Sequence, residues 1–177
     1  MTIVYIPATL AMLQQLVADG AVRAVNGTAF ALTPKLREAY AEGDDDELAE
    51  VALQEAALAS LRLLALDADG DGGTAAESLP PRRVVLAAEV DLDASGAKHR
   101  PDLDDAVVRL GEPVRIEDVI AAYVDNAAAE PAVTKAIEFI DAADLGDEDA
   151  ELIVGDAQDH DLAWYANQEL PFLLELL

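Results

Sequence analysis

The chain has 177 residues, and 11 Lys and Arg against 36 Asp and Glu give it a net charge of −25 at pH 7. This charge repels phosphate, which argues against direct nucleic-acid binding and against docking on anionic membranes, because both depend on Lys and Arg. Apolar residues make up 53% of the chain, too many for a disordered acidic tail and enough for one sizeable core. We therefore expect a single folded domain over residues 1–177.

Cysteine is absent, which excludes disulfides, thiolate catalysis and Cys-ligated zinc or iron–sulfur clusters. The two histidines, His99 and His160, have no metal-ligand spacing. The first twenty residues lack the basic start and uninterrupted apolar run of a signal peptide, and no apolar run is long enough for a transmembrane helix. We expect a cytoplasmic protein that uses no cofactor.

The chain opens with a predicted strand and helix. Thr2–Ile6 is β-branched and aromatic, as in a buried strand. Thr9 and Gly20 are typical of the two ends of the helix that follows. Asn26-Gly27 predicts a turn within Ala21–Leu32, which forms either a hairpin or one bent strand.

The middle of the chain predicts two helices and a central strand. Thr33-Pro34 is typical of a helix start. Glu47–Leu66 carries leucines around much of a helical cylinder, so we expect it to be buried against a sheet on one side and a helix on the other. Arg82–Asp91 is an apolar run with flanking charges, as in a core strand. The polar segments 67–81 and 93–105 predict exposed loops.

The second half continues the alternation of strands and helices. Val107–Leu110 and Val114–Ile116 predict an edge strand or the arms of a hairpin, and Val119–Val124 predicts a strand. Pro131 begins a clear amphipathic helix. The pattern indicates an α/β or α+β fold, in which helices pack on a mixed sheet of four or five strands.

The C-terminal region predicts a last helix, capped by Asp161, that carries the only tryptophan of the chain. On such a helix Asp161, Trp164 and Tyr165 could line a ligand pocket, with Tyr5 and Arg37 contributed by neighbouring elements. We favour the other interpretation, in which Trp164 is an aromatic plug that fills space in an alanine-rich core.

The segment that begins at Asp67 resembles the first half of a calcium-binding EF-hand loop. Asp67, Asp69 and Asp71 occupy the first, third and fifth loop positions, and Gly72 takes the sixth. The twelfth position should be a bidentate Glu but is Ser78. We expect no tight calcium site, and a solvated acidic turn is the alternative explanation.

The strongest local charge bias lies between Asp141 and Asp161, where nine acids occur without Lys or Arg. Three interpretations stay open: a solvated surface, a divalent-metal site, or a surface for a basic protein partner. We take Asp147, Glu148, Asp149 and Glu151 as the candidate partner-binding residues.

No pattern pairs a nucleophile with a base, and no Gly-rich phosphate loop follows a strand. We therefore lean against an enzyme and assign no catalytic residue. The favoured hypothesis is a non-enzymatic cytoplasmic interaction protein that presents an acidic face to a basic protein partner. The alternative is a small-molecule-binding or hydrolytic domain with a pocket near Tyr5, Arg37 and Trp164. The oligomeric state stays open.

Three segments carry a family resemblance. They are VYIPATL over 4–10, Thr33-Pro34 with Arg37-Glu38 and Tyr40, and DLAWY over 161–165 followed by Gln168-Glu169. Together they resemble a family of small uncharacterised actinobacterial proteins classed as a domain of unknown function. The resemblance implies an intracellular bacterial protein. It implies no activity, cofactor or site residue.

Overall fold

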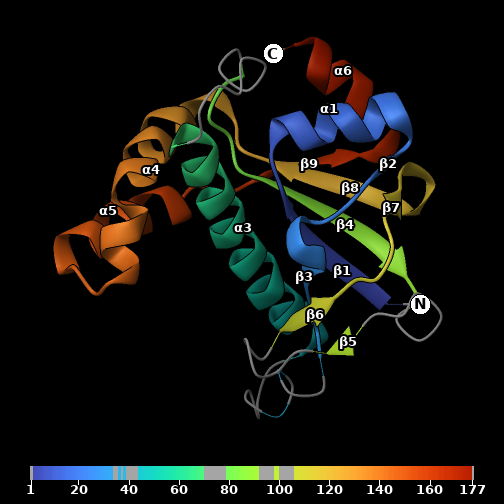
Figure 1. Cartoon of the computed structure of the whole chain (residues 1–177), viewed down its shortest axis with the longest axis horizontal. Coiled ribbons are helices and arrows are strands. Elements are labelled where there is room, and N and C mark those ends of the chain that lie inside the picture. Colours follow the sequence, from blue (N-terminus) through green and yellow to red (C-terminus); the bar gives the residue numbers. More distant parts are fainter. Residues whose placement is uncertain are drawn as a thin grey trace.

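The computed structural model describes residues 2–33, 36, 38, 44–69, 79–91, 98–99 and 106–176. In this part of the chain, seven strands form one sheet in the order β5-β6-β3-β1-β4-β8-β9, while β2 and β7 form a separate ribbon (Figure 1). The strands are β1 (Thr2–Ala8), β2 (Ala21–Val22), β3 (Thr28–Ala31), β4 (Val84–Val90), β5 (Lys98–His99), β6 (Val107–Arg109), β7 (Val114–Arg115), β8 (Val119–Val124) and β9 (Ala163–Ala166). The helices are α1 (Leu10–Asp19), α3 (Asp45–Asp69), α4 (Glu130–Asp144), α5 (Glu148–Gln158) and α6 (Leu170–Glu175).

The fold class is confirmed: helices pack on a sheet within one compact domain. The sheet is larger than the predicted four or five strands, and every described strand pair in it is antiparallel rather than mixed. The extra strands are short and lie toward the sheet edges, where few residues are available to show an alternating pattern.

Both predicted ends of the first helix are confirmed. The Thr9 hydroxyl accepts a hydrogen bond from the Met12 amide at 3.3 Å and caps α1. Gly20 ends the helix with a φ of 79°, a left-handed conformation that costs a glycine little. The chain can therefore leave β1, cross the sheet as α1 and turn back at a fixed point.

The predictions of a hairpin or of one bent strand within 21–32 are both wrong, because β2 and β3 belong to different sheets. β2 pairs with β7, whereas β3 pairs with β1 and β6. Between them Asn26 and Gly27 adopt positive φ values of 58° and 70°. A Cβ on Gly27 would lie 2.7 Å from the carbonyl oxygen of Leu110, so this turn also needs glycine for space. For the same reason β6 and β7 are not the arms of one hairpin.

The long helix α3 is buried on two sides, as predicted. One side packs with Leu48, Ala52 and Ala56 against the sheet, and further along Leu61 and Ala65 pack against α4 and α5. Figure 1 shows α3 lying between the sheet and the α4–α5 pair. α3 thus joins the sheet to a helical outer layer.

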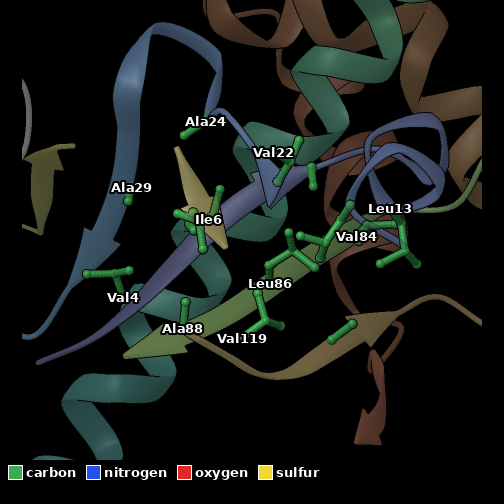
Figure 2. Packing of buried hydrophobic residues seen from close by; sticks show 14 of the residues in the cluster. Val4, Ile6, Leu13, Val22, Ala24, Ala29, Val84, Leu86, Ala88 and Val119 are labelled. Carbon is green, nitrogen blue, oxygen red and sulfur yellow. The ribbon is translucent and has the colours of Figure 1, made fainter. Parts of the chain in front are cut away.

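The opposite sheet face packs against α1, α6 and the small ribbon. Figure 2 shows side chains of β1, β4 and α1, such as Ile6, Leu86 and Leu13, meeting in this cluster, and all three are fully buried. The contributing residues are largely Ala, Val, Leu and Ile, whose summed burial supplies the main driving force for folding.

Regular secondary structure extends into both of the predicted loops. α3 continues to Asp69, and Lys98–His99 pairs with β6 as strand β5. Residues 79–81 have no regular secondary structure, and the other parts of the predicted loops, 70–78, 93–97 and 100–105, lie outside the described residues. The predicted helix after Thr33 lies mostly outside them too, although the Thr33 hydroxyl accepts from the Leu36 amide at 3.1 Å, as a cap would.

The predicted C-terminal helix is wrong over its first half. Ala163–Ala166 forms β9, which pairs with β8 at the edge of the sheet. Aromatic residues favour strands, and an open sheet edge beside β8 provides backbone partners that a lone helical turn would lack. The helix that follows, α6, begins only at Leu170 and has Pro171 in its first turn.

Candidate functional site

The highest local charge of the chain lies on α4, α5 and the segments beside them. All nine carboxylates between residues 141 and 161 have exposed side chains. Figure 1 shows α4 and α5 at one end of the molecule, on the far side of α3 from the sheet. We call these nine residues the acidic surface: Asp141, Asp144, Asp147, Glu148, Asp149, Glu151, Asp156, Asp159 and Asp161.

Two residues of the acidic surface have structural partners. Asp144 accepts two hydrogen bonds from the Arg62 guanidinium, at 3.0 and 3.1 Å, in an exposed ion pair. Asp147 is the N-cap of α5 and accepts from the Ala150 amide at 2.9 Å. Within the described part of the chain, the other seven carboxylates form no ion pair or hydrogen bond. Their charge is therefore available to a partner.

Two large apolar side chains are exposed within the same segment. Leu145, directly after α4, is 89% exposed, and Leu152 on α5 is 70% exposed. Single exposed leucines are ordinary on protein surfaces. Two of them in the same segment as unpaired carboxylates give the acidic surface apolar contact area as well as charge, and a protein interface combines an apolar centre with a polar rim.

A divalent-metal site on the acidic surface gains no support. Among the residues that the structure describes, no three His, Asp or Glu side chains are grouped closely enough to hold a metal ion. The nine carboxylates are spread over α4, α5 and the segments beside them.

The calcium candidates fall at the limit of the described chain. Asp67 and Asp69 belong to the last turn of α3, so the first loop position is helical. Asp71 and the rest of the predicted loop lie outside the described residues. A helical backbone through Asp67 and Asp69 differs from the loop that an EF-hand requires at these positions.

Trp164 lies in the edge strand β9, and its side chain is 55% exposed, so it does not fill the core. Along the sheet Trp164 is paired with Tyr123 of β8. The Tyr123 ring in turn contacts Tyr5 of β1, with centroids 6.5 Å apart and planes inclined by 57°. Paired residues of antiparallel strands share a sheet face, here the one that α3 partly covers. We call Tyr5, Tyr123 and Trp164 the aromatic row.

Carboxylates of α3 act on the two tyrosines of the aromatic row. Burial raises the pKa of Tyr5 above its ordinary value of 10, and Tyr123, Glu50 and Asp46 raise it further. Burial is also the main cause that raises the pKa of Tyr123, again with a contribution from Glu50. The carboxylates contribute because a negative charge disfavours the tyrosinate, which adds to the larger effect of burial.

The structure brings together only part of the predicted pocket. Tyr5 and Trp164 lie on the same sheet face with Tyr123 between them, whereas Tyr165 packs into the core on the opposite face. Asp161 is exposed just before β9, so it shares no helix with the two aromatic residues. Arg37 lies outside the described residues. Tyr123 was missed, because in the sequence it looks like any aromatic residue of a buried strand.

A buried ion pair is the second feature that the sequence did not reveal. The Arg83 guanidinium donates to both carboxylate oxygens of Asp125 at 2.8 Å, and both side chains are buried. Arg83 also donates to the Gln158 side chain at 2.7 Å and to the His160 carbonyl at 2.9 Å. The network ties the end of α5 to β4 and β8, so it positions the acidic surface relative to the sheet.

An open cavity of about 770 Å³ lies away from both the acidic surface and the aromatic row. It is bordered by Glu89 and Asp91 at the end of β4 and by Glu112 and Asp118 near β7. Arg115 lines it too and pairs with Asp118 at 3.3 Å. None of the described residues of the predicted pocket lines this cavity.

A family model covers residues 2–174, which is nearly the whole chain. The chain belongs to DUF6912, a family of unknown function. The predicted resemblance to a domain of unknown function is thereby confirmed. Searches of curated proteins and of solved structures found no match. No helix in the described part of this DUF6912 chain has the length and apolar character needed to span a membrane.

Proposed function

We propose that this DUF6912 protein is a non-enzymatic cytoplasmic interaction protein that binds a basic protein partner through the acidic surface. The observation that carries the proposal is the group of seven exposed carboxylates that have no partner in the described chain, together with Leu145 and Leu152. Opposite charges steer encounter and select the partner, while apolar side chains contribute contact area that excludes water.

The charge and apolar residues of the acidic surface also indicate what kind of partner it would bind. A segment that presents Lys or Arg together with one or two apolar side chains matches exposed carboxylates and exposed leucines that occur in one segment of the chain. The net charge of −25 adds a long-range attraction, which we expect to weaken as ionic strength rises.

The test is capture of partners from native lysate with a charge-reversal variant, Glu148→Lys with Asp149→Lys and Glu151→Lys. These side chains are exposed and unpaired, whereas Asp147 is left intact because it caps α5. Each reversal removes a favourable acid from the first turn of a helix, at a cost of about 0.3–1 kcal/mol, so unfolding is measured in parallel. We expect a basic partner to be captured by the wild type and lost from the variant.

A matched control separates this surface from net charge alone. Asp19→Lys with Glu112→Lys and Glu175→Lys makes the same change in charge at exposed positions on other elements. We expect the control to retain the partner. Loss of capture in both variants would reduce the interaction to general electrostatics, and retention in both would contradict the proposal.

A second candidate function is small-molecule binding near Tyr5 and Trp164. The aromatic row favours it, because the structure places these two residues on one accessible sheet face. Nothing in the described site favours the hydrolytic form of this alternative.

A further inference from the structure

The aromatic row forms because three strands each place one large ring on the same face. Tyr5 is paired with Ala87 of β4, and Tyr123 is paired on one side with Val85 and on the other with Trp164. The rings of Tyr5 and Tyr123 therefore meet across β4, where the small side chain of Ala87 leaves room for them. Trp164 continues the row on the next strand, within reach of Tyr123.

The rings of the aromatic row are accessible without being fully hydrated. Tyr5 and Tyr123 are partly buried against the cluster beneath α3, while more than half of the Trp164 side chain is open to solvent. Aromatic faces carry negative electrostatic potential and attract cations, and the attraction is larger where water is partly excluded.

Negative charge lies beside these rings and has no counter-ion in the described chain. Asp46 and Glu50 are exposed on the first turns of α3, and neither forms an ion pair with a described residue. Glu50 accepts a hydrogen bond from Gln54 at 3.0 Å, which restrains its carboxylate. Glu50 directly precedes Val51, and the side chains of Val51, Tyr5 and Tyr123 all pack against the same cluster beneath α3. The contribution of Glu50 to the raised pKa of both tyrosines agrees with this placement.

Rings and unpaired carboxylates together select one kind of ligand. A small inorganic cation prefers oxygen ligands and gains little from ring faces, whereas an organic ammonium offers alkyl groups to the rings and charge to the carboxylate. We propose that the aromatic row, with Asp46 and Glu50, is a binding site for an organic ammonium cation. The proposal concerns another part of the molecule than the acidic surface and does not depend on it.

Titration with choline chloride tests the site, and its neutral isostere 3,3-dimethylbutan-1-ol serves as the matched ligand. Ionic strength is held constant with sodium chloride, so that general screening of the charge of −25 does not change. Trp164 is the only tryptophan, so its emission reports on this site alone. We expect a saturable change with choline and none with the neutral isostere.

Variants locate the binding. We expect Trp164→Leu, followed by calorimetry or NMR, to weaken choline binding roughly tenfold, which is the size of one cation–π contact. Glu50→Gln keeps the shape of the side chain and removes its charge, and we expect it to weaken binding at least about threefold. The control variants Phe172→Leu and Glu117→Gln change an exposed ring and an exposed carboxylate elsewhere, and we expect both to bind like the wild type.

A second ligand shows where the cation comes from. An acetylated and amidated trimethyllysine carries the same charged group on a peptide backbone. Tighter binding than choline would support the site with a protein side chain as its ligand, and equal or weaker binding would support it with a free small molecule.

Three results would overturn the proposal. One is the absence of saturable binding of either cation at concentrations up to about 100 mM, well above the millimolar range of a weak site. Another is equal binding of the neutral isostere. The third is binding that Trp164→Leu and Glu50→Gln leave unchanged in variants that circular dichroism shows to be folded.

Discussion

Arg83 and Asp125 show how much a single pair of residues can decide in this molecule. Both side chains are buried, and the carboxylate accepts two guanidinium hydrogen bonds and one from the Arg83 amide. Taking two charges out of water is expensive, so such a pair persists only when its hydrogen bonds are nearly complete. The contacts to Gln158 and His160 supply the remaining partners.

Removing one partner of this pair should be strongly destabilising. Asp125→Asn leaves the Arg83 charge buried without its counter-charge, and we expect the free energy of unfolding to fall by about 3–5 kcal/mol. Denaturant unfolding measures this loss of free energy. Arg62→Met breaks the exposed pair with Asp144 and serves as the comparison, with an expected loss of about 1 kcal/mol or less. Equal losses in the two variants would show that burial of the Arg83 pair has no energetic weight.

Trp164 carries a second prediction at this scale. Because more than half of its side chain is exposed, Trp164→Ala should cost about 1 kcal/mol or less, well below the roughly 3–5 kcal/mol of a buried tryptophan. Its emission in the folded protein should already be close to that of solvent-exposed indole. A strongly blue-shifted emission together with a large fall in the unfolding midpoint would place Trp164 in the core.

The tyrosines give a pH-dependent prediction. Their folded-state pKa values are raised, so the protonated forms favour folding, and this contribution is complete below pH 10 and lost as pH rises through the raised values. Glu50→Gln removes one cause and should lower the pKa of both Tyr5 and Tyr123. NMR titration of the tyrosine ring carbons measures the two values. Unchanged values would mean that Glu50 lies too far away to serve the cation site.

At the scale of elements, the sequence predicted best where a segment is long and its ends carry clear signals. The strand over β1, the cap at Thr9, the glycine at the end of α1, the buried strand β4 and helix α4 all follow from local residues. These signals are local because they satisfy backbone groups that the element itself leaves unpaired.

The failures share a physical cause. Whether β2 pairs with β3 or with β7 depends on residues more than 90 positions apart, and the turn at Asn26-Gly27 is compatible with both. The spacing of the residues around β9 suggests a helix. The segment is nevertheless a strand, because its backbone pairs with the edge of β8. In the candidate site, the exposed acids could be predicted from the composition. The position of Tyr123 beside Trp164 and the Arg83–Asp125 pair could not be predicted, because both depend on how the strands pair.

The N-cap of α5 provides the prediction at this scale. Asp147 accepts from the Ala150 amide, so Asp147→Ala should lower the free energy of unfolding by about 0.5–2 kcal/mol. Asp147→Asn, which can still cap, should recover most of this loss. Thermal or denaturant unfolding checks both. If the two variants lose the same stability, the charge of Asp147 matters rather than its cap.

At the scale of the whole molecule, the acidic surface lies apart from the main hydrophobic core. The sheet with α1 and α6 holds most of the buried apolar residues, while α4 and α5 form an outer layer that carries the acidic surface (Figure 1). α3 and the Arg83 network fix this layer to the sheet. The acidic surface is therefore presented on a rigid support, which lowers the entropy cost of binding.

Hydrogen exchange of the protein with and without its captured partner tests this function most directly, because it reports which backbone amides a bound partner protects. We expect the partner to slow exchange over α4, α5 and the turn between them, and to leave α1 and α6 unchanged. Protection confined to α1, α6 or the β2–β7 ribbon, with no effect over 141–161, would contradict the proposed role of the acidic surface.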